Sequence, residues 1–228
     1  MCVDSENNTS TYIKALDDET GHGTFIAGII GAKNDNYGIR GVSKTANIIS
    51  YKYDKNANGG GNADEIARNN SINAIIALSN LSGNVIVNAS YGRENYSLAE
   101  CTAIDNFNGL FVCAAGNSSY NLETNPIYPA SYDLDNMITV GSSSIDDTIW
   151  EDSNFGSISV DLFAPGADII STIPNHMQSN MGYEGYFINS GTSFAAPYVA
   201  GVASMIWSRY PNLSALDVKD RILSNVDY

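Results

Sequence analysis

The chain has few basic residues and no apolar run long enough to cross a membrane. Its 228 residues include 11 Lys and Arg against 25 Asp and Glu, for a formal net charge of −14. An acidic surface repels the phosphates of nucleic acids and of anionic lipids, so no nucleic-acid partner is expected. A helix that spans a bilayer needs about 20 consecutive apolar residues. The sequence contains no such run, and no membrane span is expected.

Cysteine and histidine are also scarce, which limits disulfide and metal chemistry. Cys2, Cys101 and Cys113 are odd in number, form no C-x-x-C pair and have no histidine at metal-ligating spacing. We expect Cys101 and Cys113 to be ordinary buried thiols. His176 lies in a polar loop and is expected at the surface. The N-terminal MCVDSENNTS is polar and is not a secretion signal, so an exported protein would carry its signal upstream of this chain.

The composition is that of a folded domain, with 43% apolar and 10% aromatic residues. The length suits a single domain over residues 1–228. Alternating strand and helix patterns predict an α/β fold with a mostly parallel central sheet and helices on both faces. The predicted strands cover 47–53, 84–90, 109–117, 137–142 and 160–166, and the predicted helices lie within 21–32, 59–80, 97–107, 191–210 and 214–226.

Two of these helices begin with a capping-box pattern, a polar cap followed three residues later by an acidic residue. The pattern is Asn62 with Glu65 in the first helix and Ser214 with Asp217 in the second. The first of the two helices also has an apolar face that we expect to be buried. That face consists of Ile66, Ile72, Ile75 and Ile76.

In such a fold the ligand crevice lies at the carboxyl ends of the strands, where the loops 115–117 and 189–191 are expected. Three polar residues are candidates for the chemistry. His22 stands between Gly21 and Gly23, where small neighbours give a substrate access to the imidazole; a packing histidine is the alternative. Ser193 begins a helix, where free N–H groups and the helix dipole favour a developing oxyanion; a simple N-cap is the alternative. Asn117 follows a strand and is either a turn residue or directs its NH₂ group into the crevice.

The sequence resembles the subtilisin-like serine proteases from residue 17 to the C-terminus. The resemblance implies a subtilisin-like fold and a serine endopeptidase that hydrolyses peptide bonds through an acyl-enzyme on Ser193. It implies that His22 is the general base and that Asn117 and the Ser193 N–H form the oxyanion hole. The similar segments, in family order, are GHGTFIAG (21–28), NASYG (88–92), AAGN (114–117), SNFG (153–156), VDLFAPG (160–166) and GTSFAAPYVAG (191–201).

The same resemblance assigns residues that bind the substrate. A strand that pairs with the substrate backbone is matched by Ser90, Tyr91 and Gly92, and a wall of the primary pocket by Ala114, Ala115 and Gly116. Ile127 matches the pocket floor, which implies a preference for small or medium apolar residues before the cleaved bond. The Tyr128-Pro129 bond is expected to be cis, as in relatives.

The orienting acid of the triad has no clear match in the sequence. In the family this acid ends the first strand, well before the histidine. Asp4 matches superficially, but Glu6 stands where glycine belongs, and Asp17 and Asp18 are further alternatives. The chain therefore resembles a protease domain clipped at both ends. A pseudoprotease that binds polypeptide or regulates a partner without cleavage stays open, as does a peptide ligase.

The resemblance also bears on cofactors, partners and location. No cofactor is required for catalysis, but the loop over 33–39 coordinates structural calcium in relatives, a cation that prefers oxygen ligands. The matching ligands are the carbonyls of Lys33, Tyr37 and Ile39 and the side chain of Asp35; a plain Asn-rich turn is the alternative. The implied partners are a polypeptide substrate and the protein's own propeptide. The implied location is extracellular or at the cell surface.

Overall fold

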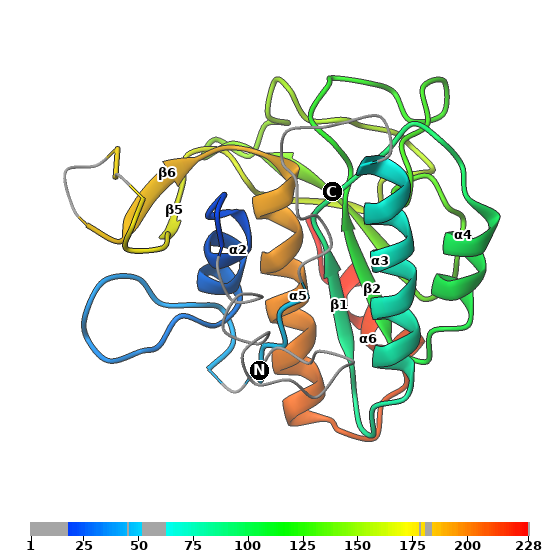
Figure 1. Cartoon of the computed structure of the whole chain (residues 1–228), viewed down its shortest axis with the longest axis horizontal. Helices are drawn as coiled ribbons and strands as arrows, with labels where there is room; N and C mark the ends of the chain where they lie inside the picture. The colour runs from blue at the N-terminus through cyan, green and yellow to red at the C-terminus, as the bar shows by residue number, and fades with distance from the viewer. Residues whose placement is uncertain (1–17, 45, 52–62, 178, 181–183, 228) are drawn as a thin grey trace.

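The computed structural model describes residues 18–44, 46–51, 63–177, 179–180 and 184–227 (Figure 1). These residues form a four-stranded parallel sheet in the order β1-β2-β3-β4 and a two-stranded antiparallel ribbon of β5 and β6. The strands are β1 (Ile86–Ala89), β2 (Leu110–Ala114), β3 (Met137–Ser143), β4 (Leu162–Pro165), β5 (Ile169–Thr172) and β6 (Tyr186–Asn189). The helices are α2 (His22–Gly31), α3 (Ala63–Ser79), α4 (Leu98–Asp105), α5 (Thr192–Arg209) and α6 (Ala215–Leu223).

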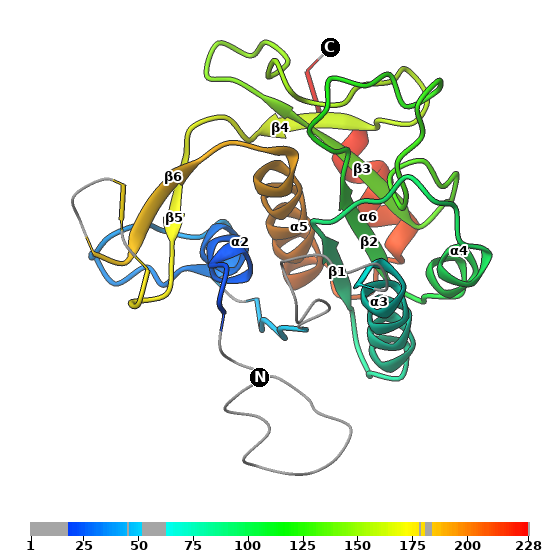
Figure 2. The same ribbon diagram turned by 45° about the horizontal axis from the view of Figure 1, so that its top comes forward.

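Helices cover both faces of the parallel sheet (Figures 1 and 2). On one face, α5 and α6 pack against strand residues such as Val112 and Val140, which are fully buried. On the other face, Ile75 of α3 and Ile104 of α4 pack with Phe111. Successive side chains of β2 point to opposite faces, so this strand is apolar throughout. The predicted α/β architecture is confirmed.

The helix starts and buried faces are set by local chemistry. At α6 the Ser214 hydroxyl accepts from the Asp217 N–H at 3.1 Å and the Asp217 carboxylate accepts from the Ser214 N–H at 2.9 Å, which confirms that capping box. The other predicted cap, Asn62, lies outside the described residues. The predicted apolar face of α3 is wrong in part, because Ile66 and Ile76 are 54% and 51% exposed. Adjacent helix positions are about 100° apart, so the strip around Ile75 is the part that reaches the sheet.

Two strand predictions need correction. Residues 47–51 form no strand, and 52–53 lie outside the described residues. The strand predicted over 84–90 is the shorter β1, and three of its four residues are only half-buried. A cavity lies between the segment 46–51 and β1, and in the described chain the outer edge of β1 has no strand partner. The ribbon β5–β6 was not predicted.

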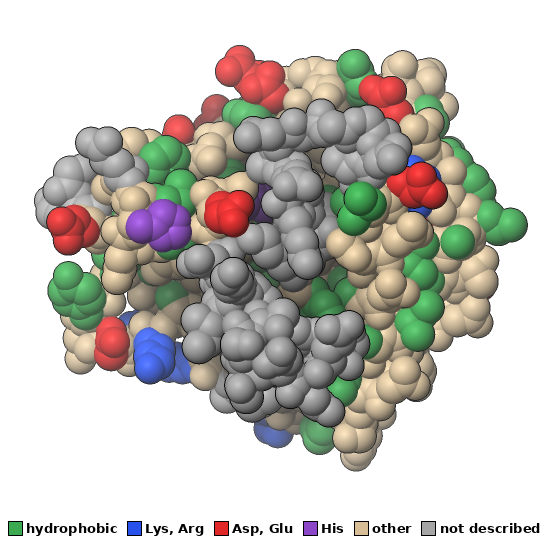
Figure 3. Space-filling model, in the orientation of Figure 1, with side chains coloured by type: hydrophobic (Ala, Val, Ile, Leu, Met, Phe, Trp, Pro, Cys, Tyr) green, Lys and Arg blue, Asp and Glu red, His purple; other side chains and the backbone are tan. Residues whose placement is uncertain are grey.

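The surface agrees with the charge balance of the sequence. Acidic side chains are spread over the face shown in Figure 3, whereas Lys and Arg occupy a few places on it. His176 is exposed, as predicted. Cys113 is buried and Cys101 is half-buried, and both are free thiols. No helix of the described chain has the length and apolarity needed to cross a bilayer.

Candidate active site

Helices α2 and α5 begin side by side near the carboxyl ends of β1 and β2 (Figure 1). His22 is the first residue of α2, and Ser193 is the second residue of α5. The His22 ring lies 5.8 Å from the ring of Phe194, centre to centre, and Phe194 packs on Phe25 at 4.4 Å. The structure therefore brings the predicted base and the predicted nucleophile to the same place in the fold.

Asn117 is held against the first residue of α5. Its side-chain oxygen accepts hydrogen bonds from the N–H of Thr192 at 2.9 Å and from the Thr192 hydroxyl at 2.8 Å. The same hydroxyl accepts from the Gly116 N–H at 3.0 Å. Both bonds to Asn117 use its oxygen, and a Cβ added to Gly191 would lie 3.3 Å from its side-chain nitrogen. Asn117 thus ties the loop after β2 to the start of α5, and its role as an oxyanion donor stays a prediction.

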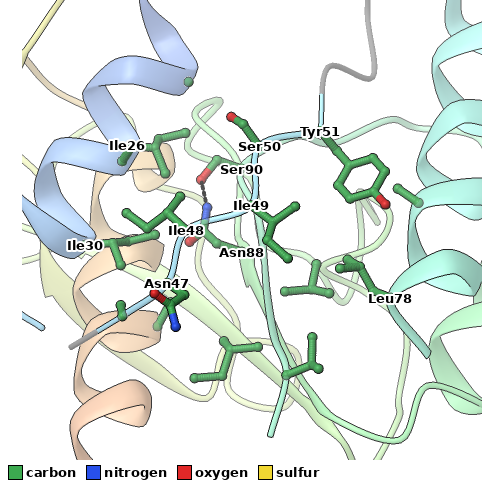
Figure 4. A pocket seen from close by; sticks show the side chains of 18 of the residues that line it. Ile26, Ile30, Asn47, Ile48, Ile49, Ser50, Tyr51, Leu78, Asn88 and Ser90 are labelled. Atoms are coloured by element: carbon green, nitrogen blue, oxygen red, sulfur yellow. Dashed lines mark hydrogen bonds between the residues drawn. The ribbon is translucent and has the colours of Figure 1, made fainter. Parts of the chain in front are cut away.

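Ser90 joins the end of β1 to the same helix start. Its hydroxyl donates to the carbonyl oxygen of Ser193 at 2.8 Å and accepts from the side-chain amide of Asn88 at 2.9 Å (Figure 4). The other amide atom of Asn88, its oxygen, is buried and has no hydrogen-bond partner among the described residues. This oxygen is an acceptor left open on the edge of β1.

Ile127 lies between two glycines of the predicted primary pocket. A Cβ added to Gly92 would come within 2.7 Å of Ile127 Cγ2, and one added to Gly116 would lie 3.9 Å from the same atom. Ala114 and Ala115, the rest of the predicted wall, are buried. Gly92 and Gly116 therefore lie beside the Ile127 side chain and Ala115 packs in the same cluster, whereas Ala114 packs on the other face of the sheet with α5. The role of these residues as a primary pocket stays a prediction.

Two backbone segments fix the position of Ile127. Arg93 and Tyr128 exchange two backbone hydrogen bonds, of 2.8 Å and 2.7 Å. The hydroxyl of Ser131 accepts from the Ile127 N–H at 3.1 Å, and the Tyr128-Pro129 bond is cis, which confirms that prediction. The Tyr91 ring, on the predicted substrate strand, is directed inward, and its hydroxyl donates to Glu100.

Asp18 caps helix α2. One carboxylate oxygen accepts from the Gly21 N–H at 2.9 Å, and the other accepts from the N–H and the hydroxyl of Thr24, each at 2.7 Å. Burial alone raises the pKa of Asp18, but these hydrogen bonds outweigh it and hold the pKa below its ordinary value. The structure thus gives Asp18 the role of a helix cap, while Asp4 and Asp17 lie outside the described residues.

The Asp18 charge also acts on the predicted base. Burial lowers the pKa of His22 below its ordinary value, and the Asp18 carboxylate partly offsets this shift. A lowered pKa keeps the imidazole neutral at pH 7. His22 is therefore in the protonation state that a general base requires.

A cavity of about 1160 Å³, which we name the slot, extends from His22 along β1 (Figure 4). One wall is the segment 46–51 and the other is β1, with α2, α3 and α5 closing the sides. The lining is mostly apolar but includes Asn88, whose amide oxygen is the open acceptor described above. The apolar side chains labelled in Figure 4 are Ile26, Ile30, Ile48, Ile49 and Leu78.

The sequence model of the subtilase family matches residues 2–228. The chain belongs to the subtilase family of serine proteases. It is 32% identical over 218 residues to Subtilisin-like protease 2 of Plasmodium falciparum, which covers 92% of this chain and 15% of that protein. It is 33% identical to Subtilisin DY of Bacillus licheniformis, covering 91% of this chain and 70% of that one. With the Cell wall-associated protease of Bacillus subtilis the identity is 34%, covering 93% and 22%.

Solved structures agree with the family assignment. A crystal structure of a cold adapted subtilisin-like serine proteinase superposes with a TM-score of 0.72 at 32% identity, over 90% of this chain and 67% of that one. An S41 psychrophilic protease superposes with a TM-score of 0.76 at 27% identity, over 91% and 70%. This subtilase chain thus spans a small part of two of the relatives named above and about two thirds of the others.

The predicted calcium loop of this subtilase is an exposed turn. The Asp35 carboxylate accepts from the Tyr37 N–H at 3.1 Å, and Asn36 and Gly38 have positive φ angles of 65° and 62°. No group of three or more His, Cys, Asp or Glu side chains in the described chain is arranged to hold a metal ion. Among the predicted calcium ligands, Asp35 is the one carboxylate, and the others are the carbonyls of Lys33, Tyr37 and Ile39.

Sequence reasoning missed two residues that shape the site. Thr192 directs the Asn117 amide, and its position directly before Ser193 at a helix start was the available signal. Glu100 lies 1% exposed in the core beside the substrate strand. The Ser97-x-x-Glu100 pattern reads as an ordinary helix cap, so the sequence carried no sign of this burial.

Proposed function

We propose that this subtilase chain is the catalytic part of a serine endopeptidase that works through an acyl-enzyme on Ser193. The proposal is supported by the contacts among three chain segments, the starts of α2 and α5 and the loop after β2, which carry His22, Ser193 and Asn117. Ser193 attacks the carbonyl carbon of the scissile bond, and its proton passes to His22. The NH₂ of Asn117 and the N–H of Ser193 stabilise the oxyanion. His22 then protonates the leaving amine, and water hydrolyses the acyl-enzyme.

The proposed substrate is a polypeptide bound in extended form along residues 90–92. The contact of Ile127 with Gly92 and its approach to Gly116 support a shallow apolar primary pocket. The β-branched Ile127 side chain has little rotamer freedom to move aside. Small or medium apolar residues are therefore preferred before the cleaved bond.

The acid that orients His22 is proposed to stand on an extended strand that fills the slot. Three observations support this: the slot is mostly apolar, the outer edge of β1 is unpaired in the described chain, and the Asn88 oxygen lacks a donor there. Because His22 lines the slot, an acid on such a strand can reach the imidazole. The strand comes from outside the described residues, either from this chain or from further sequence of the protein.

A binding role without cleavage is the rival function. It is favoured by one observation, the commitment of the Asp18 carboxylate to the cap of α2 rather than to His22. Incubation with denatured casein and analysis of the peptides by mass spectrometry separates the two functions. New peptide termini that disappear in Ser193→Ala support the endopeptidase. Casein that is bound by the wild type but stays intact supports the pseudoprotease.

Calcium, the propeptide and the location are proposed at family level. A structural calcium ion would use Asp35 in the loop 33–39, and the enzyme would be extracellular or at the cell surface, bound by its propeptide before activation. Thermal unfolding with calcium and with EGTA tests the ion. A stabilisation by calcium that Asp35→Asn removes supports the site, and an unfolding temperature that does not depend on calcium supports the plain turn.

A further inference from the structure

The carboxylate of Glu100 does not form the capping-box hydrogen bond expected at the start of α4. Glu100 is the third residue of α4, and Ser97 is the N-cap, so a capping box would join the carboxylate to the Ser97 N–H. The Ser97 N–H donates instead to the Tyr132 hydroxyl at 3.3 Å. Glu100 turns inward, where its side chain is 1% exposed.

Four side chains from other segments surround this carboxylate. One oxygen accepts from the Ser71 hydroxyl at 3.0 Å, the Tyr91 hydroxyl at 3.2 Å and the Arg93 guanidinium at 3.1 Å. The other oxygen lies 3.3 Å from the Tyr132 hydroxyl, which shares its proton between this carboxylate and the carbonyl oxygen of Ser97 at 3.0 Å. Burial raises the pKa of both tyrosines, and the Glu100 charge raises it further, so both hydroxyls remain protonated donors at neutral pH.

The ion pair is a poor means of stabilising a fold. The Arg93 side chain is only 8% exposed, and its Nη2 has no hydrogen-bond partner within the described residues. Removing two charges from water carries a large desolvation cost, and apolar residues of similar volume often stabilise as well or better. A network that joins four chain segments around one carboxylate is better suited to fixing their relative positions.

Both ends of the network lead to the primary pocket. On one side Arg93 follows Gly92, and on the other Tyr132 lies 4.9 Å from Tyr128, ring centre to ring centre. The backbones of Arg93 and Tyr128 are joined by two hydrogen bonds, directly beside the Gly92–Ile127 contact. Glu100 therefore contacts the segment 92–93 through Arg93. It contacts the segment 127–128 through the Tyr132 ring, which packs on the Tyr128 ring.

We propose that Glu100 is a positioning residue that sets the separation of these two pocket walls, and hence the selectivity for the residue before the cleaved bond. It acts through Arg93 and Tyr132 and does not touch the substrate. The inference rests on the proposed peptidase function and adds to it a determinant of specificity outside the pocket.

Peptide binding tests this inference without requiring turnover. In a Ser193→Ala background, fluorescence anisotropy compares two labelled hexapeptides that carry Val or Gly before the target bond. A fitted pocket should bind the Val peptide about tenfold or more tightly than the Gly peptide. Glu100→Gln keeps the side-chain shape but leaves the Arg93 charge unpaired, so the Val-to-Gly affinity ratio should fall toward one.

A matched control separates positioning from loss of stability. Asp161 is another paired carboxylate, with a side chain that is 24% exposed; it accepts from the Thr139 N–H at 2.7 Å and lies 3.7 Å from the Lys219 ammonium. It directly precedes β4, at the end of the parallel sheet opposite to the site. Asp161→Asn should lower the unfolding temperature and leave the affinity ratio unchanged.

A second variant covers the case in which Glu100→Gln does not fold. The double variant Arg93→Met/Glu100→Gln buries no unpaired charge, and its affinity ratio should also fall toward one. Wild-type ratios in the variants that fold would overturn the positioning role. If neither peptide binds to the Ser193→Ala protein, the proposed peptidase function fails, and this inference fails with it.

Discussion

The side-chain oxygen of Asn117 accepts both the N–H and the hydroxyl of Thr192, at 2.9 Å and 2.8 Å. These two bonds tie the loop after β2 to the first turn of α5, directly before Ser193. They use the oxygen of the amide and leave its NH₂ group for the proposed role of oxyanion donor. An oxyanion donor fixed before the reaction costs no reorganisation when the charge develops.

Replacing Asn117 with alanine should lower turnover and leave substrate affinity nearly unchanged. The donor bonds mainly to the tetrahedral oxyanion and only weakly to the ground-state carbonyl, so kcat should fall by about 10²–10³, the range known for an oxyanion-hole asparagine in a subtilisin. Steady-state kinetics on a peptide substrate measures both parameters. A variant with weaker binding and intact turnover would show that Asn117 is a turn residue only.

Thr192→Val should also reduce kcat, but by less than Asn117→Ala. Valine keeps the shape of threonine and removes the hydroxyl that holds the Asn117 oxygen, so the amide is less well oriented. Thr192→Ser retains the hydroxyl and is the matched control, with turnover close to wild type. In a double-mutant cycle the Thr192→Val effect should vanish in the Asn117→Ala background. Additive effects would mean that Thr192 acts independently of Asn117.

Asp18→Asn should move the acid limb of the kcat/KM profile to lower pH. The Asp18 carboxylate favours imidazolium and so raises the pKa of His22 against the effect of burial. Removing its charge lowers that pKa, and the imidazole then stays neutral to a lower pH. Asparagine keeps an oxygen that can accept from the start of α2. An acid limb that stays in place or moves to higher pH would contradict the coupling.

Ile127→Gly should widen the primary pocket and admit Phe and Tyr before the cleaved bond. The Ile127 side chain lies against Gly92 and near Gly116, and its removal opens the space between those two backbones. A peptide library with varied residues at that position measures the profile, with Ile127→Val as the control that keeps the β-branch. The pocket assignment is wrong if the wild type already prefers Phe or Tyr, or if Ile127→Gly leaves the profile unaltered.

The sequence alone predicts those strands and helices whose burial follows from the residues of a single segment. Strand β2 is apolar at every position because both faces are covered, and α6 carries its cap in Ser214 and Asp217. His22 and Ser193 became candidates because glycine-flanked and helix-start motifs are local patterns, and the family resemblance, not the pattern, assigned their roles. Features of this kind need no knowledge of distant segments.

The remaining features depend on partners far away in the sequence. Residues 47–51 have a strand-like composition, but a strand requires a neighbour, and the slot lies where that neighbour would pair. In the sequence Glu100 has the position of a capping-box residue. In the structure the Ser97 N–H donates instead to the hydroxyl of Tyr132, 32 residues after Glu100. The ribbon β5–β6 depends on pairing across a loop whose polar sequence suggested no strand.

The most direct test of the central claim is the site of reaction with a fluorophosphonate. The purified protein is treated with the reagent, and the adduct is located by tandem mass spectrometry. We predict one adduct, on Ser193, which is lost in Ser193→Ala, slowed in His22→Ala and kept in the control Ser190→Ala. Labelling that persists unchanged in Ser193→Ala would contradict the assignment of Ser193 as the nucleophile.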